Sequence, residues 1–291
     1  NLAPLPAGTI TSLTDTEFQP VLVLDYQLMQ DVMLYGSLKK GFKAGGFSGT
    51  DGLSFRPESV TAVELGAKTK TLDNRLLVNV AVFSGKYSDL QVSSFDPVLR
   101  AFVTNNAASA KNQGVELSSE FAATDKLRLS LDVAYLDATY DEFTNAACWA
   151  GQTTLGTGCV PSSVNPAVNV QDLSGVTLPY APKWSGTLGV DYRLDAGPRF
   201  YTKWGADLYV TSEFATLSDI NPFAFQPGFE RVNLRASFAP NDDKWEVAVV
   251  ARNVTDLRTA SFKNAIPGGF FSISSFTEPP ATYTIQARFK F

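Results

Sequence analysis

The sequence predicts an all-β protein, a transmembrane antiparallel up-and-down β-barrel of which this chain supplies about 11 of an expected 22 strands. Three observations lead to that fold class. Apolar and polar residues alternate through most of the chain, without a sustained 3.6-residue period. Short polar turns alternate with longer loops, as in outer-membrane barrels. Residues 281–291 place apolar side chains on one strand face and polar ones on the other, and they end on Phe-Lys-Phe.

The first five expected strands are Phe18–Leu28, Val32–Phe47, Ser59–Thr71, Leu76–Phe95 and Val103–Ala123. Polar turns at 30–31 and 72–75 lie inside the first two strand pairs. Longer loops at 48–57 and 96–102 follow those pairs. Asp, Asn, Gly and Pro suit the turns because their side chains hydrogen-bond locally or their backbones adopt turn conformations at low cost.

The sixth expected strand, Leu127–Phe143, follows the polar turn 124–126 and has the clearest alternation. One of its faces is apolar, with Leu127, Leu129, Leu131, Val133 and Tyr135. The opposite face carries Arg128, Ser130, Asp132 and Ala134. Such a strand fits lipid on one side and a wet lumen on the other. The longest expected loop, 144–182, follows it.

The last five expected strands are Lys183–Leu194, Phe200–Phe214, Phe229–Ala239, Lys244–Phe262 and Ala281–Phe291. Short turns at 195–198 and 241–243 alternate with loops at 215–228 and 263–280. The final strand follows a long loop, so it is expected to run inward and to leave the C-terminus in the periplasm. An odd number of strands is unlike a complete bacterial barrel, whose count is even. We therefore interpret residues 1–291 as the C-terminal part of a larger barrel domain.

Composition excludes several functions. The chain has 291 residues, of which 44% are hydrophobic and 18% charged, and no apolar run reaches the roughly 18 residues of a transmembrane helix. There is no histidine, which rules out Ser-His-Asp and Cys-His catalysis and His-based zinc sites within this chain. The net charge of −5 argues against a nucleic-acid partner. We expect no enzyme activity, no catalytic residue, no metal site and no cofactor.

Local motifs then point to one family. They are 34–47 (LYGSLKKGFKAGGF), 55–58 (FRPE) with 63–68 (VELGAK), 82–83 (VF) with 87–91 (YSDLQ), 112–117 (NQGVEL), 180–185 (YAPKWS), 253–256 (NVTD) and the terminal Phe-Lys-Phe. In order and spacing the chain resembles the C-terminal half of the barrel in TonB-dependent outer-membrane receptors. It departs from them at 279–282, where Pro-Pro-Ala-Thr replaces the common Pro-Arg-Thr, and it contains no plug domain or TonB box.

The resemblance implies active transport across the outer membrane of a Gram-negative bacterium. Such a receptor binds a scarce large solute, chiefly a ferric siderophore, with cobalamin, haem or a glycan in some members. Its partners would be outer-membrane lipid, the solute, and the TonB complex acting through a plug domain. Two alternatives remain at this point: a passive porin-like barrel and a soluble β-rich binding module.

Candidate site residues lie in the long loops. Cys148 and Cys159 are close in a polar, Gly-rich stretch and are expected to form a disulfide, the alternative being free thiols. The ligand-contact candidates are flat rings that can stack on a siderophore, sugar or corrin: Trp149, Phe223, Phe225, Phe270 and Phe271. Alternatively, these rings pack on one another or form the interfacial belt.

Charges on the lumen face form a second set of candidates. Four arginines could attract an anionic chelate, Arg231, Arg235, Arg252 and Arg288. The alternative is that they pair with acids on the same face such as Asp132, Asp191 and Glu246. Glu64 and Glu116 are also expected to point to the lumen, where their charge is solvated.

Overall fold

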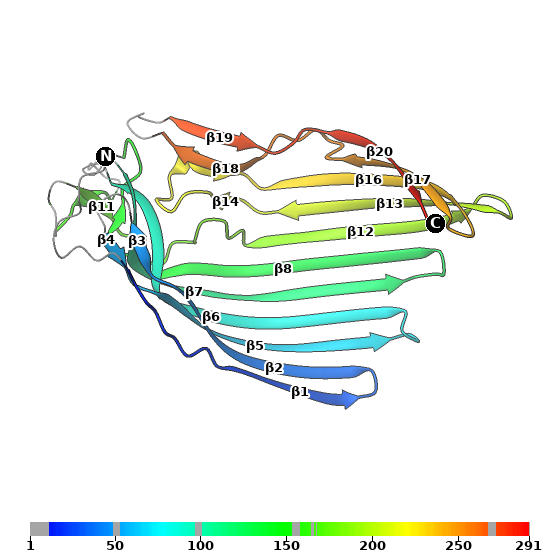
Figure 1. Cartoon of the computed structure of the whole chain (residues 1–291), viewed down its shortest axis with the longest axis horizontal. Helices are drawn as coiled ribbons and strands as arrows, with labels where there is room; N and C mark the ends of the chain where they lie inside the picture. Colours follow the sequence, from blue (N-terminus) through cyan, green and yellow to red (C-terminus); the bar gives the residue numbers. More distant parts are fainter. Residues whose placement is uncertain are drawn as a thin grey trace.

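A computed structural model describes residues 12–48, 53–96, 101–152, 158–163, 166, 168–266 and 272–290. Eleven strands form one antiparallel sheet in which each strand pairs with the next long strand in the chain (Figure 1). They are β1 (Val21–Met29), β2 (Val32–Lys43), β5 (Glu58–Thr71), β6 (Leu76–Asp96), β7 (Ala101–Ala122), β8 (Leu127–Glu142), β12 (Trp184–Asp195), β13 (Phe200–Thr211), β16 (Phe229–Pro240), β17 (Trp245–Arg252) and β20 (Thr282–Phe289). Within the described residues the sheet is open, with β1 and β20 at its two edges. The all-β, up-and-down prediction is confirmed.

The two ends of the sheet differ. The short turns gather at one end, together with the C-terminus, and the longer connections gather at the other (Figure 1). The longer connections contain a 3₁₀ helix and small sheets: η1 (Pro222–Ala224), β3 (Gly46–Ser48) with β4 (Leu53–Phe55), β9 (Ala146–Ala147) with β10 (Val160–Pro161) and β11 (Asn169–Gln171), β14 (Phe214–Ala215) with β15 (Phe225–Gln226), and β18 (Ala260–Ala265) with β19 (Ile273–Thr277). We call this the loop end and the other the turn end. Within the described residues, no helix has the length and apolarity needed to cross a membrane.

One face of the sheet is apolar and uncovered. Register places Leu131 of β8 opposite Leu188 of β12, and Val249 of β17 opposite Ile285 of β20. Leu188, Val249 and Ile285 are 52%, 46% and 77% exposed, so no protein element covers this face in the described chain. A continuous apolar surface of this kind marks a contact with lipid or another protein. The face assignment expected for Leu127–Phe143 agrees with this register.

The other face carries ion pairs between neighbouring strands. Arg235 of β16 donates to Asp191 at 2.5 Å and to Asp207 at 2.8 Å, and Arg288 donates to Glu246 at 2.7 Å. These contacts follow from the period-two alternation, because residues at paired or diagonal positions on one face lie within reach of each other. Arg235 and Arg288 therefore pair with acids on the same face, which was the alternative to attracting an anionic chelate. Arg231 also pairs with an acid, Glu278 in the connection after β19, at 3.1 Å, which the sequence pattern did not predict.

Glycine permits close packing on this polar face. The Tyr35 ring lies over Gly66, where a Cβ would overlap it, and its hydroxyl donates to Glu64 at 2.7 Å. Gly114 lies beneath the Phe83 ring, and a Cβ there would be 2.7 Å from the ring. Both glycines are needed because a neighbouring aromatic ring occupies the space of a side chain.

The buried core lies at the loop end, on the polar-face side of the sheet. It consists of residues of β6, β7 and β8 covered by the β8–β12 connection: Val92, Ala108, Ala110, Tyr140, Phe143, Ala146 and Leu173. The backbone N–H of Leu178 in this connection donates to the carbonyl of Ala138 of β8 at 3.0 Å. This connection is therefore packed against the sheet and supports the residues that it carries.

Three strand predictions are wrong in part. Lys244–Phe262 is not one strand, because β17 ends at Arg252 and the chain turns at Asn253, whose φ is 52°. The Asn253 side chain accepts the N–H of Leu257 at 3.0 Å and donates to the carbonyl of that residue at 2.9 Å, which closes the turn. Val32–Phe47 is likewise interrupted after Lys43. The predicted Phe200–Phe214 ends at Thr211 and resumes as β14.

Four predicted loops contain strands. Residues 144–182 hold the small sheet of β9, β10 and β11, and residues 263–280 hold the end of β18 and all of β19. Residues 48–57 hold β4, and residues 215–228 hold β15. Those of two or three residues are too short to show alternation in the sequence. The remaining strand boundaries agree with the structure within about three residues, as expected for pattern-based assignment.

Candidate ligand-binding site

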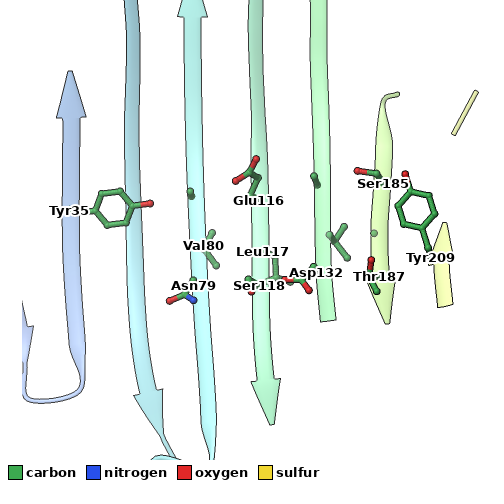
Figure 2. A pocket seen from close by; sticks show the side chains of 14 residues that line it. Tyr35, Asn79, Val80, Glu116, Leu117, Ser118, Asp132, Ser185, Thr187 and Tyr209 are labelled. Atoms are coloured by element: carbon green, nitrogen blue, oxygen red, sulfur yellow. The ribbon is translucent and has the colours of Figure 1, made fainter. Parts of the chain in front are cut away.

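The polar face contains a shallow cavity of about 340 Å³ near the middle of the sheet. Figure 2 shows Tyr35 of β2, Glu116 of β7, Asp132 of β8, and Thr187 and Tyr209 on the neighbouring strands around it. Register explains the arrangement, because Asp132 lies opposite Thr187, which in turn lies opposite Tyr209. A polar cavity formed by five or more strands of one sheet is what the wall of a water-filled lumen requires.

Acidic side chains of this wall lack basic partners. Glu64, Glu116 and Asp132 form no ion pair with any described residue. Glu64 accepts only the Tyr35 hydroxyl among the hydrogen bonds of the described side chains. As expected, Glu64 and Glu116 lie on the same face as Asp132. These three carboxylates are solvated or available to a positively charged group.

A second, deeper pocket of about 440 Å³ lies at the loop end. Its walls come from five separate parts of the chain: the loop ends of β6 and β7, the β8–β12 connection, residues 217–219, and residues 264–266 at the end of β18. The Phe95 and Phe102 rings meet edge to face, with centroids 5.6 Å apart, and Trp149 and Ile266 add further apolar area. This combination of aromatic walls and a few polar groups is typical of small-molecule sites.

Asp219 is the acidic residue that lines this pocket. Burial raises the pKa of its carboxyl above the usual value, so it ionises less readily than an exposed aspartate. Its Oδ1 accepts the backbone N–H of Asn221 at 3.1 Å, and the Gln171 side chain donates to its backbone carbonyl at 2.8 Å. Ser218 also ties the segment to β6, donating to the carbonyl of Ser93 at 3.0 Å. These bonds hold Asp219 at the pocket wall.

The structure separates the five predicted ligand-contact residues. Trp149 lines the pocket, and Phe223 meets its ring edge to face at 5.9 Å. Phe225 instead belongs to β15, paired with Ala215. Phe270 and Phe271 lie outside the described residues. The contact between Trp149 and Phe223 matches the alternative stated for these rings, that they pack on one another.

Sequence reasoning missed most of the pocket wall. Phe95 precedes the predicted loop 96–102 and Phe102 ends it, and their pairing across the β6–β7 ladder brings them together. The contact between the two rings follows from the register of the two strands, and neither residue indicates it alone. Asp219 had no signal in the sequence, since its burial depends on the β8–β12 connection.

The structure joins Cys148 and Cys159 in a disulfide with Cα atoms 6.0 Å apart, and both residues line the pocket. We predict that this bond is present in exported protein. Closing a loop of this length contributes about 2–3 kcal/mol in the chain-entropy model, largely to the β8–β12 connection. Mass spectrometry of the peptide spanning both cysteines, with and without reduction, measures it. Free thiols in correctly exported protein would contradict the prediction.

The family model that matches the chain is described as "TonB dependent receptor-like, beta-barrel" and covers residues 3–254. Among curated proteins, the metal-pseudopaline receptor CntO of Pseudomonas aeruginosa is 31% identical over 139 residues. That match covers 48% of this chain and 19% of the relative.

Two solved receptors have a similar fold. The ferric yersiniabactin uptake receptor FyuA of Yersinia pestis aligns with a TM-score of 0.68 at 17% identity, over 94% of this chain and 37% of that one. The siderophore receptor PiuA of Acinetobacter baumannii aligns with a TM-score of 0.67 at 18% identity, over 94% of this chain and 36% of that one. The chain thus spans a little over a third of these receptors.

Proposed function

Because the chain belongs to the TonB-dependent receptor-like β-barrel family, we propose that it forms part of a receptor that actively imports a large metal–siderophore complex. Members of this family are outer-membrane β-barrels of Gram-negative bacteria, and they are transport receptors rather than enzymes. The observation that carries the proposal is the family match across residues 3–254 together with a pocket at the loop end. The family does not support the passive porin alternative.

The relatives favour a chelated metal as the solute. CntO is a receptor for metal-pseudopaline, and FyuA takes up ferric yersiniabactin. An aromatic pocket with hydroxyl and amide groups can stack on and hydrogen-bond such a chelator. A ferric siderophore is our first choice, with cobalamin, haem or a glycan as alternatives.

The proposed orientation places the loop end outside the cell and the turn end, with the C-terminus, in the periplasm. Long extracellular loops and short periplasmic turns are the rule for bacterial outer-membrane barrels. This orientation exposes the 440 Å³ pocket to solute arriving from the medium.

Coupling to TonB would use parts outside residues 1–291. We propose that these residues are the C-terminal part of the barrel domain, in a barrel of about 22 strands, and that a plug domain occupies the lumen. The unpaired acids Glu64, Glu116 and Asp132 support this, because they offer a negative surface to basic groups inside the barrel. TonB-transmitted energy would then move the plug and release the solute inward.

Solute binding tests the proposal. Calorimetric titration of the full-length receptor with a panel of catecholate, hydroxamate and carboxylate ferric siderophores should identify a ligand. Trp149→Ala should weaken its binding about two- to twelvefold, because stacking on one ring contributes about 0.5–1.5 kcal/mol.

The matched control is Phe276→Ala, which removes a 64% exposed loop-end ring that does not line the pocket. Uptake by cells should also stop when the proton-motive force is collapsed. Equal losses in the two variants would contradict the assigned pocket, and uptake that persists without the proton-motive force would contradict active transport.

A further inference from the structure

Three lysines form a row across neighbouring strands near the loop end. Register places Lys40 of β2 opposite Thr61, Thr61 opposite Lys86 of β6, and Lys86 opposite Lys111 of β7. Lys111 in turn lies opposite Thr139 of β8. Neighbouring strands are about 4.8 Å apart, so the three lysines span roughly 14 Å.

The row lies on the apolar face, not on the lumen face. Lys86 and Val82 are four residues apart on β6, and Lys111 and Val115 are four apart on β7, so each pair shares a face. Tyr135, opposite Val115, packs on the Trp184 ring with centroids 4.8 Å apart. Tyr and Trp at this position mark the edge of a membrane-facing belt. The lysines thus lie about 13 Å beyond that edge towards the loop end, at the level of lipid headgroups.

Carboxylates partner only the outer two lysines. Lys40 pairs with Glu17 at 3.2 Å and Lys111 pairs with Asp141 at 3.5 Å. Lys86 between them is exposed and forms no ion pair with a described residue. Lys86 and Lys111 are directly opposite each other, an arrangement in which like charges destabilise a sheet. A bound anion would remove that repulsion.

The surrounding groups are donors that suit a phosphate. Thr61 and Thr139 belong to the row itself, and Ser59 and Ser88 form the next paired position towards the loop end. The acid Asp137 on the turn-end side already accepts the Gln113 amide at 3.1 Å. The centre of the row therefore combines ammonium and hydroxyl groups beside an apolar belt.

We propose that Lys40, Lys86 and Lys111 bind the phosphate of an outer-leaflet lipid headgroup, a phosphorylated glycolipid of the lipid A type. The row faces outward and continues the apolar belt, so a lipid can place its acyl chains on the belt and its phosphate on the lysines. A free anion would gain only the charge contact. This inference rests on the proposed orientation, in which the loop end meets the outer leaflet.

The test uses full-length receptor in detergent micelles, titrated with lipid A and with its dephosphorylated form at low salt, and read by native mass spectrometry. The double variant Lys86→Gln/Lys111→Gln should bind lipid A about thirtyfold more weakly, from about 1 kcal/mol for each lysine near a charged lipid surface. The control, Lys70→Gln/Lys203→Gln, removes the same charge from the lumen face and should bind as the unmodified protein does. Dephosphorylated lipid A should bind weakly to all three.

Equal affinity of the two double variants for lipid A would overturn the proposal. Displacement of lipid A by inorganic phosphate at equal concentration would also overturn it, because the row would then be a site for soluble anions. Siderophore binding is measured separately in each variant and should not change. If the unmodified receptor binds no siderophore, that result contradicts the proposed function and leaves the lipid site standing.

Discussion

Replacing Leu131 with arginine should lower the free energy of unfolding of the full-length barrel in lipid by about 2–4 kcal/mol. Leu131 is the fifth residue of β8 and lies on the apolar face, opposite Leu188 of β12. A transmembrane strand needs about 9–11 residues, so a residue about five from the turn end lies near the middle of the bilayer. An arginine there must place its charge in hydrocarbon or distort the bilayer to reach water.

Asp132→Asn is the matched control, because Asp132 is the next residue of the same strand and lines the lumen cavity. It forms no ion pair with a described residue, so loss of its charge should cost far less. Denaturant titration of both variants in liposomes, followed by tryptophan fluorescence, gives the two free energies. Equal costs would contradict the assignment of the two faces.

Gly114→Ala should destabilise the barrel by about 1–3 kcal/mol, the usual cost of overpacking. A Cβ at Gly114 would overlap the backbone carbonyl of Tyr135 and lie 2.7 Å from the Phe83 ring. Gly114 pairs with Phe83 on one side and Leu136 on the other, so the carbonyl cannot move without disturbing the β7–β8 ladder.

Gly41→Ala provides the comparison, since it also adds one methyl group within a strand of the same sheet. There the nearest atom to a new Cβ is Val60 Cγ1 at 3.4 Å, an ordinary contact. We expect a change of about 0.4–1 kcal/mol in the stabilising direction, from the lower entropy of the unfolded chain. Both are measured as unfolding free energies in the same lipid. A Gly114→Ala cost no greater than the effect at Gly41 would show that β7 tolerates the methyl group.

The sequence supports the prediction for Leu131 more directly than the prediction for Gly114. The face on which Leu131 lies follows from the alternation of apolar and polar residues at 127–135. The cost at Gly114 depends on a ring from β6 and a carbonyl from β8 meeting at one point of β7. The break at Asn253 lies between these cases. Its sequence, Asn-Val-Thr-Asp, is largely polar, but the turn itself depends on the side-chain bonds to Leu257.

Alternation and turn spacing were enough to identify the eleven long strands, their antiparallel order and the lipid-facing side, because these depend on residues two apart in one strand. The loop pocket was beyond such reasoning: Phe95 at the end of β6 and Trp149 and Asp219 in two later connections meet only after the chain has folded. Likewise, Lys40, Lys86 and Lys111 are far apart in the chain, and only the register of four strands aligns them. Period-two patterning specifies which way a side chain faces, whereas its neighbours across strands and loops depend on long-range packing.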